Sequence, residues 1–565
     1  MPTIDIEYAE FEKLLGISLG MDMEKVDEIL AYVKGEVKLW DEKAGVMSIE
    51  IKDTGRPDVW NVEGMTRALR GFLGLETGLR EYKVDKPLVD VHVDPGLVDI
   101  RPYIGCSIVK GVKLSDAIIR GFMHMQDKLD QSYGRNRQRT SIGLYAFDLL
   151  KPPLTYGVAK PTAVSFAPLG FAEKMSLKEI LQKHPKGLEY GHIVNRHPMY
   201  PILLDAEKKV LSFPPVINSN DLGRITDQTR NVLVEVTGTS NEAVLNVLKI
   251  VTLSLVDRGG KAYAARVHYP KAETPAVTPD FEAGLIDLDV AYANKVTGLK
   301  LTAKQIAELL PKAGHGIDDV GSGMISVRVP CFRVDVMHAV DLIEDVAIAY
   351  GYDRIEPLWR RLPTTGGLRL EQRLIDIARE IMMGLGFQEV FTYTLTNLEN
   401  LFTKMNLKKQ PIVEIANPKV QTLTCMRNWL LPSLLEFLSS NLSVEYPQRI
   451  FELGKVTVPD GKSETKTRDE DWLAAVVSHA SASFTEIKSD LDALFTNLGL
   501  EWTIKETKHP SFIEGRAGAI AVQGAKIGIV GEIDPTVLVS WKLENPVAAF
   551  EIDMAKLVRA KRVAR

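Results

Sequence analysis

Cysteine is scarce in this chain: three occur among 565 residues, and their spacing fits neither a zinc ribbon nor a dense disulfide framework. Such usage is typical of a reducing, intracellular compartment. Long apolar runs are missing too, since nothing approaches the about 18 uninterrupted apolar residues of a membrane span. The N-terminus, MPTIDIEYAEFEKLL, is acidic where a secretory signal would be basic and then apolar. We therefore expect a cytoplasmic protein with no membrane segment.

An excess of charge of one sign is also missing. Lysine and arginine number 69 against 74 aspartates and glutamates, a net charge of -5. No general positive field therefore attracts nucleic acid, and any RNA contact must be local. The sequence contains no P-loop, no nucleophile elbow and no dinucleotide fingerprint, and its histidines are scattered without metal-ligand spacing. These absences argue against P-loop NTPases, α/β-hydrolases, Rossmann dehydrogenases and zinc sites.

Hydrophobic residues make up 45% of the chain and charged residues 25%, the average of folded water-soluble proteins. At roughly 150 residues per domain, the length predicts about three to five domains. A Pro- and Thr-rich segment at 271–280 indicates a linker, and Pro357 to Gly367 indicates a second boundary. We predict an α+β multidomain protein with four parts: 1–80, mixed α/β; 85–270, strands with two long helices; 275–352, a small domain; and 360–565, an antiparallel sheet with flanking helices.

Local patterns place some elements more closely. Apolar spacing and a preceding cap predict a helix at about 241–257. Ser176 and Glu179 form the pattern of a capping box, so a shorter helix should begin there. FQEVFTYTLT, 387–396, is rich in aromatic and β-branched residues and predicts a strand.

The densest acidic cluster lies in FRVDVMHAVDLIEDVAIAYGYDRI, where a helix is expected over about 336–350. Its buried stripe should comprise Val336, Val340, Ile343, Ala347 and Tyr350. That leaves Asp341, Glu344 and Asp345 together on a neighbouring face. An oxygen-rich cluster suits a hard cation such as Mg²⁺. A solvated helix face is the alternative, and it is the commoner outcome for an acidic helix.

Two further segments offer polar side chains. Ser212, Glu235 and Thr237 lie near the ends of expected strands, where they could line a pocket for a polar ligand or could simply be strand ends and a helix cap. Residues 133–139, YGRNRQR, are a basic stretch with an aromatic neighbour. That stretch could touch phosphates or could be a solvated loop.

Seven segments, spread over nearly the whole chain, form a recognisable series. They are GRPDVWNVEGMTRALRGFLG (55–74), RPYIGCSIVKGV (101–112), KPPLTYGVAK (151–160), VLSFPPVIN (210–218), FRVDVMHAVDLIEDVAIAYGYDRI (332–355), LLPSLLEFLSSN (430–441) and PVAAFEID (546–553). In this order they resemble the β-subunit family of phenylalanyl-tRNA synthetases, of the archaeal and eukaryotic cytosolic type.

The resemblance implies one subunit of a class II aminoacyl-tRNA synthetase, an α2β2 heterotetramer that joins phenylalanine to tRNA(Phe) using ATP and Mg²⁺. ATP and phenylalanine would bind at the α subunit. Residues 85–270 would be an editing domain that hydrolyses mischarged Tyr-tRNA, 275–352 a small winged or HTH-like metal-binding domain, and 360–565 a class II synthetase-like domain lacking catalytic motifs. The family's Mg²⁺ ligands fall on Asp335, Asp341, Glu344 and Asp345, and its editing pocket falls on Leu203, Ser212, Glu235 and Thr237, with Glu235 where the pattern expects Asp.

The implied loss of chemistry in 360–565 has a physical basis. Class II catalysis needs an arginine in a Phe-Arg-x-Glu arrangement for the ATP α-phosphate and a second arginine after a glycine-rich strand for the γ-phosphate. The corresponding strands read Arg449-Ile450-Phe451-Glu452 and PVAAFEIDMAKL, the latter without a glycine run or a terminal arginine. Charge developing on the phosphates would then lack a preorganised partner. Two alternatives remain: a non-catalytic RNA-binding or assembly protein, and a free-standing aminoacyl-tRNA deacylase.

Overall fold

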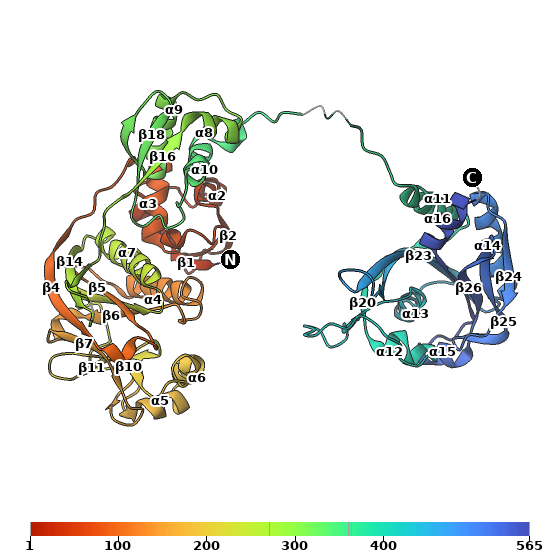
Figure 1. Cartoon of the computed structure of the whole chain (residues 1–565), viewed down its shortest axis with the longest axis horizontal. Helices are drawn as coiled ribbons and strands as arrows, with labels where there is room; N and C mark the ends of the chain where they lie inside the picture. Colours follow the sequence, from red (N-terminus) through yellow and green to blue (C-terminus); the bar gives the residue numbers. More distant parts are fainter. Residues whose placement is uncertain (1, 271, 360–361, 363, 564–565) are drawn as a thin grey trace. The chain divides into compact units, whose positions relative to one another are not determined.

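The computed structural model describes residues 2–270, 272–359, 362 and 364–563. This part of the chain divides into two compact units, Met1–Leu358 and Trp359–Arg565 (Figure 1). The division lies in the segment where the sequence indicates a boundary, although residues 360, 361 and 363 of that segment lie outside the described residues. No helix of the described chain is long and apolar enough to cross a membrane.

The first unit begins with a small sheet in the order β1-β3-β2. Helices α1, α2 and α3 pack with this sheet around a shared core. The elements are β1 (Thr3–Glu7), α1 (Tyr8–Leu15), α2 (Met23–Leu30), β2 (Gly35–Asp41), β3 (Val46–Ile51) and α3 (Val62–Phe72).

The body of the first unit is a mixed sheet with the strand order β12-β11-β10-β7-β4-β14-β5-β13-β6. Helices α4 (Asp116–Gln131) and α7 (Asn241–Asp257) pack along it, while α5 (Leu177–Lys183) and α6 (Pro185–Tyr190) lie between β7 and β10 in the chain (Figure 1). The strands are β4 (Val84–Val93), β5 (Tyr103–Lys110), β6 (Thr140–Ala146), β7 (Leu154–Ala159), β10 (Tyr200–Leu204), β11 (Val210–Phe213), β12 (Ile217–Asn218), β13 (Asn231–Gly238) and β14 (Lys261–His268).

Part of the predicted linker belongs to this sheet. Residues Ala276–Thr278 form β15, which pairs with β14. The Thr278 hydroxyl donates to the carbonyl of Cys106 on β5 and accepts from its N–H, at 2.8 and 3.1 Å. The prediction of a linker over 271–280 is therefore wrong at its C-terminal end, because so short a strand has no hydrophobic alternation for the sequence to reveal.

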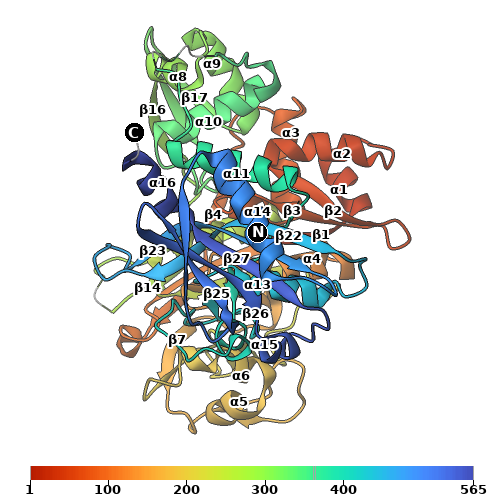
Figure 2. The same cartoon turned by 90° about the vertical axis from the view of Figure 1, so that its right-hand side faces the viewer.

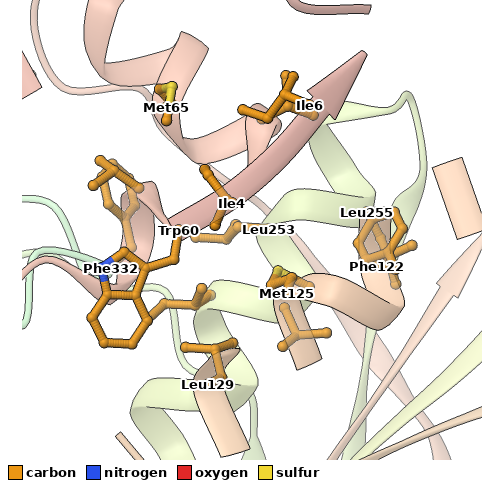
Figure 3. Close-up of a cluster of buried hydrophobic side chains, with 14 of the residues drawn as sticks. Ile4, Ile6, Trp60, Met65, Phe122, Met125, Leu129, Leu253, Leu255 and Phe332 are labelled. Atoms are coloured by element: carbon orange, nitrogen blue, oxygen red, sulfur yellow. The ribbon is translucent and has the colours of Figure 1, made fainter. Parts of the chain in front are cut away.

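The N-terminal part and the large sheet share one hydrophobic core. Trp60, just before α3, belongs to the same buried cluster as Met125 and Leu129 of α4 and Leu253 of α7 (Figure 3). Trp60 is 2% exposed. Residues 1–80 and 85–270, which the sequence separates, are consequently joined by apolar packing rather than by a loose connection.

The remainder of the first unit is a small sheet in the order β16-β18-β17, gathered with α8, α9 and α10 (Figure 2). Its elements are β16 (Gly284–Asp289), α8 (Val290–Thr297), α9 (Ala303–Leu309), β17 (Gly316–Val320), β18 (Met324–Val329) and α10 (Ala339–Tyr350). The helix predicted from 336 starts at Ala339, because the Asp341 carboxylate accepts from the N–H groups of Met337 and His338, both at 2.8 Å, and closes the helix there.

The buried face of α10 also differs from the predicted stripe. Val340 is 45% exposed, whereas Asp345 is only 3% exposed. The core side is formed by Leu342, Ile343 and Val346. The prediction that Asp345 lies on an outer face with two other acids is therefore wrong, because Asp345 is turned inward with the apolar side chains.

The second unit is a sheet in the order β19-β22-β23-β27-β26-β25-β24, antiparallel except for β19 against β22. Helices α11, α14 and α16 pack around one core, and α13 and α15 around another. The elements are α11 (Leu370–Gly384), β19 (Gln388–Glu389), α13 (Leu431–Ser440), β22 (Gln448–Pro459), β23 (Thr467–Ser478), α14 (Phe484–Leu498), β24 (Trp502–Glu506), β25 (Phe512–Val522), β26 (Ala525–Ile533), α15 (Pro535–Ser540), β27 (Val547–Asp553) and α16 (Met554–Val563).

The strand predicted over 387–396 is mostly absent. Within it the structure has only β19 and the two-residue β20 (Leu395–Thr396). Phe391 and Tyr393, which favour a strand by propensity, lie between them and are 92% and 81% exposed. These side chains are not packed within the described part of their own unit, and β-propensity depends on such packing.

Candidate functional site

A cavity of about 270 Å³ opens beside the large sheet, and Glu235 of β13 and Ser212 of β11 line it. Arg137 and Asn218 line it as well. Side chains alternate between the two faces of a strand. Ser212 and Glu235 both lie on the face of the sheet that lines the cavity. This volume suits the side chain of a small ligand.

Glu235 is the central acid of the cavity and is 2% exposed. Its Oε2 accepts a hydrogen bond from the Tyr145 hydroxyl at 2.8 Å. Within the described chain, the other oxygen, Oε1, and the Ser212 hydroxyl have no hydrogen-bond partner. Burial raises the pKa of Glu235 to about 7. An unpartnered buried polar atom costs about 1–3 kcal/mol, so these two atoms are suited to a ligand that supplies the missing hydrogen bonds.

The other two predicted pocket residues lie behind the cavity wall. Leu203 of β10 is fully buried and pairs with Ser212 in the sheet. Thr237 of β13 accepts a hydrogen bond from Arg101 at 2.9 Å and is also buried. The structure therefore brings Ser212 and Glu235 into the cavity, while Leu203 and Thr237 position the strands that carry them.

The sequence does not single out Arg101 or Tyr145 near the cavity. It does not assign Arg137 to the cavity either, although Arg137 belongs to the basic stretch at 133–139. Arg101 is 1% exposed, and burial lowers its pKa. Arg137 is 9% exposed, its Nε lies 3.0 Å from Asp130, and its Nη1 donates to the carbonyls of Pro215 and Val216. The basic stretch at 133–139 is thus not entirely a solvated loop, and Arg137 is not available to bind a phosphate because it is buried in contacts within the protein. The sequence does not indicate these contacts, because they depend on the geometry of the turn.

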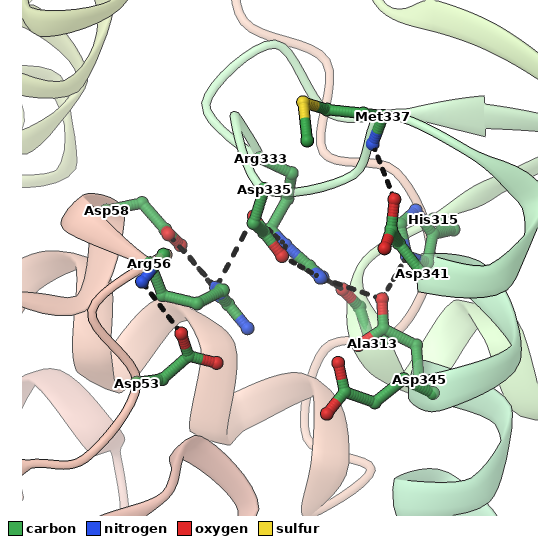
Figure 4. Close-up of polar contacts among 12 residues, drawn as sticks. Asp53, Arg56, Asp58, Ala313, His315, Arg333, Asp335, Met337, Asp341 and Asp345 are labelled. Atoms are coloured by element: carbon green, nitrogen blue, oxygen red, sulfur yellow. Dashed lines mark hydrogen bonds and ion pairs between the residues drawn. The ribbon is translucent and has the colours of Figure 1, made fainter. Parts of the chain in front are cut away.

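Two of the four predicted Mg²⁺ ligands share one arginine, and the other two contact different groups; Figure 4 labels Asp335, Asp341 and Asp345. Asp335 and Asp345 both pair with the Arg333 guanidinium, at 2.7 and 2.8 Å. His315 lies 2.7 Å from Asp345. The remaining two acids are placed elsewhere: Asp341 caps α10, and Glu344 pairs with Lys34 of the N-terminal part at 2.7 Å.

This arrangement does not fit a Mg²⁺ site. No three His, Cys, Asp or Glu side chains of the described residues are grouped so that they could hold a metal ion. Burial acts to raise the pKa of Asp345, but Arg333 and His315 outweigh it and hold that pKa well below its usual range. Arg56 adds a second guanidinium, 3.8 Å from Asp335. Arginine therefore supplies the positive charge that a cation would bring.

Among the described residues, the two strands that the resemblance aligns with class II motifs carry no unpaired arginine. Arg449 of β22 pairs with Glu486 and Asp490, both at 2.7 Å. Glu452 is fully buried and pairs with Arg427 at 2.7 Å. The last strand, β27, reads VAAFEID and contains no basic residue. Arg427 and Arg449 are therefore both already paired with carboxylates of this chain.

Comparison with known proteins is consistent along the whole chain. Residues 286–352 match the family model of the tRNA synthetase B5 domain, and residues 355–554 match that of the phenylalanyl tRNA synthetase beta chain CLM domain. The phenylalanine--tRNA ligase beta subunit of Pyrococcus horikoshii is 44% identical, over 99% of this chain and 100% of that one. The same subunit of Thermofilum pendens is 38% identical, over 99% and 98%.

A solved structure agrees with the first unit. The crystal structure of an N-terminal fragment of the phenylalanyl-tRNA synthetase beta-subunit from Pyrococcus horikoshii matches with a TM-score of 0.60 at 40% identity, covering 62% of this chain and all of that one. Identity at this level over nearly the full length of several relatives is decisive. The chain belongs to the phenylalanine–tRNA ligase β-subunit family.

Proposed function

We propose that this chain is the β subunit of a cytoplasmic α2β2 phenylalanine–tRNA ligase and that its own cavity hydrolyses Tyr-tRNA formed in error. The α subunit would bind ATP and phenylalanine and attach the amino acid to tRNA(Phe). Mg²⁺ would enter with ATP, because ATP sites commonly hold this ion through the phosphates. The cavity around Glu235 is the observation that carries the editing part of the proposal.

Tyrosine differs from phenylalanine by one hydroxyl, which a hydrophobic synthetic site excludes poorly. A second site that hydrogen-bonds the hydroxyl can select tyrosine instead. Glu235 Oε1 and the Ser212 hydroxyl are unpartnered, and both line the cavity. In the proposal the tyrosine hydroxyl donates to Glu235 and accepts from Ser212, so phenylalanine would leave both atoms unsatisfied. The selectivity arises from that difference.

The hydrolytic step does not use a protein nucleophile in this proposal. Ser212 has no histidine beside it among the cavity residues, so the usual pairing of a serine nucleophile with a histidine base is not present there. A water molecule would attack the ester carbonyl, and the buried residues would hold the tyrosyl group in place for it. Glu235 is accordingly a specificity residue.

The need for an α partner follows from the second unit. Its arginines at the relevant strands are paired with carboxylates, so the chain alone should bind no ATP phosphates there. Phe391 and Tyr393 are exposed apolar side chains suited to a protein interface. ATP–pyrophosphate exchange should require the α subunit, and robust exchange by this chain alone would contradict the assignment.

The editing proposal is tested by Glu235→Ala in the assembled enzyme. We expect Tyr-tRNA to accumulate, because the tyrosine hydroxyl loses its acceptor, while the rate of Phe-tRNA synthesis stays within about twofold. Glu235→Asp is the matched control, since it retains the carboxylate. Tyr-tRNA hydrolysis at the wild-type rate in the alanine variant would remove Glu235 from the site.

A further inference from the structure

Tyr145 lies behind Glu235 in the wall of the cavity that Glu235 lines, here called the editing cavity. Its hydroxyl donates to Glu235 Oε2 at 2.8 Å, although Tyr145 is not among the residues that line the cavity. The same hydroxyl is 3.5 Å from Asn218 Oδ1, which is a much weaker alternative acceptor. Oε2 is therefore occupied from behind, and Oε1, which has no partner within the described chain, is the oxygen left for a ligand.

The neighbouring strand leaves room for this contact. Gly143 of β6 pairs with Glu235 of β13. A Cβ at position 143 would lie 2.3 Å from the Tyr145 hydroxyl oxygen and 2.5 Å from Glu235 Oε2. Both oxygens thus occupy the space that a side chain at 143 would fill. Glycine weakens the interior of a strand, and here the close approach of these two side chains gives it a packing reason.

The ring of Tyr145 holds the hydroxyl in place. Tyr145 is 0% exposed and belongs to the buried cluster that also contains Leu203 and Leu233. Close packing in such a cluster leaves the ring little freedom to move. Burial raises the pKa of Tyr145 well above its ordinary value, so the hydroxyl keeps its proton and remains the donor to Oε2. The direction of this hydrogen bond is therefore fixed at any pH near neutrality.

The carboxylate of Glu235 needs such a contact to have one orientation. The terminal torsion of a glutamate side chain is broad, so burial by itself does not decide which oxygen faces the cavity. The hydrogen bond from Tyr145 distinguishes the two oxygens, because one of them is bound from behind. Oε1 then has a defined position relative to the cavity.

We propose that Tyr145 is a positioning residue for the selection of tyrosine: by holding Oε2, it turns Oε1 of Glu235 into the editing cavity, where Oε1 meets the ring hydroxyl of a bound tyrosyl ester. This inference rests on the editing function proposed above and assigns the orientation of its specificity residue. Tyr145 itself does not touch the ester. A phenylalanyl ester has no ring hydroxyl, so its hydrolysis does not depend on Tyr145.

The test is Tyr145→Phe in the assembled enzyme, since phenylalanine keeps the packed ring and removes the hydroxyl. We expect the KM for Tyr-tRNA hydrolysis to rise about tenfold, because Oε1 is no longer held toward the tyrosine hydroxyl. The kcat for Tyr-tRNA and the hydrolysis of Phe-tRNA should stay within about twofold of the wild-type values. A general loss of structure would instead change both substrates together.

Tyr156→Phe is the matched control. Tyr156 is also 0% exposed and belongs to the same buried cluster, but its hydroxyl donates to the carbonyl of Arg101, at 2.9 Å. This variant loses a buried tyrosine hydroxyl without changing the partner of Glu235. The KM for Tyr-tRNA should therefore stay within about twofold of the wild-type value.

A positioning residue acts through its partner, and a double-mutant cycle measures this directly. In the Glu235→Ala background, Tyr145→Phe should change the KM for Tyr-tRNA less than twofold, because no carboxylate remains to be held. An unchanged KM in Tyr145→Phe, an equal rise in Tyr156→Phe, or a further tenfold rise in the Glu235→Ala background would each overturn the role of Tyr145.

Binding of a ligand that cannot be hydrolysed separates this inference from the editing function. The probe is 3′-amino-3′-deoxyadenosine that carries tyrosine through an amide bond. The wild-type enzyme should bind it about tenfold more tightly than Tyr145→Phe. Equal affinities would overturn the role of Tyr145 and leave the editing proposal intact. A wild-type enzyme that neither bound the amide nor hydrolysed Tyr-tRNA would refute both.

Discussion

At the scale of single residues, Glu235 makes the stability of the chain depend on pH. Burial raises its pKa from 4.5 to about 7 in the folded chain. The folded state therefore keeps a proton that the unfolded state loses above pH 4.5. The free energy of unfolding consequently falls as pH rises from about 4.5 through about 7, by about 3 kcal/mol for this group.

Glu235→Gln should remove that contribution, because glutamine keeps a similar shape and does not titrate. We expect the difference in unfolding free energy between pH 5 and pH 8 to shrink by about 2–3 kcal/mol, measured by urea denaturation at each pH. Tyr145→Phe, which removes the hydroxyl that contacts Glu235, should leave Glu235 titrating. An unchanged pH difference in the glutamine variant would mean that Glu235 titrates normally.

Arg333 holds two carboxylates that would otherwise be buried without compensation. It is 5% exposed and contacts both Asp335 and Asp345. Arg333→Met should lower the free energy of unfolding by about 3–5 kcal/mol, the usual effect of leaving a buried charge unpaired. The double variant Arg333→Met with Asp345→Asn should recover part of the loss. Urea denaturation of the three proteins measures both effects.

The same residues give a test of the Mg²⁺ hypothesis. Because arginine already neutralises Asp335 and Asp345, 10 mM Mg²⁺ should not change the melting temperature of the wild-type chain relative to EDTA. A stabilisation that Glu344→Gln with Asp345→Asn removes would instead support the ion predicted from the sequence. In that case Arg333 must move away from the carboxylates when the ion binds.

The residues of the candidate site show what sequence can reveal. Ser212 and Glu235 were named because the family resemblance points to them; taken alone, the sequence also allowed them to be plain strand ends and a helix cap. The sequence could not show that Asp345 turns inward, because its partner His315 lies 30 residues away and helical periodicity carries no information about such a pair. Tyr145 and Arg101 stayed hidden for the same reason.

At the scale of elements, local signals worked where the structure is locally determined. Helix α7 spans Asn241–Asp257, the predicted range, and the capping box of α5 is present with Ser176 and Glu179 in both of its hydrogen bonds. The strand predicted over 387–396 and the linker over 271–280 were wrong in part. Whether each of these segments forms a strand depends on a distant segment with which it can pair or pack, and local propensity carries no information about that segment.

The capping box of α5 permits a direct measurement. Ser176→Ala removes the side chain that accepts from the Glu179 N–H, at 3.3 Å, and should destabilise the first unit by about 1 kcal/mol. Ser176→Asp retains an acceptor at the same position and should lower the free energy of unfolding by only a few tenths of a kcal/mol. Equal losses in the two variants would show that the hydroxyl serves some contact other than the cap.

At the scale of the whole molecule, the chain comprises two units that each contain their own buried cores. Such units generally fold by themselves. The relative whose structure was solved as an N-terminal fragment matches 62% of this chain, about the extent of the first unit. The proposed editing cavity lies within that unit.

Fragments 1–358 and 359–565 should therefore each fold when produced separately. At about 0.7 kcal/mol per residue near 60 °C, their unfolding enthalpies should be about 250 and about 145 kcal/mol, and together they should equal that of the whole chain. The first fragment should also hydrolyse the tyrosyl ester of adenosine, because all residues of the proposed site belong to it. Calorimetry and a hydrolysis assay measure these outcomes. If fragment 1–358 failed to melt cooperatively, or folded without hydrolysing the ester while the full chain did so, its stability or its active cavity would have to depend on residues beyond 358.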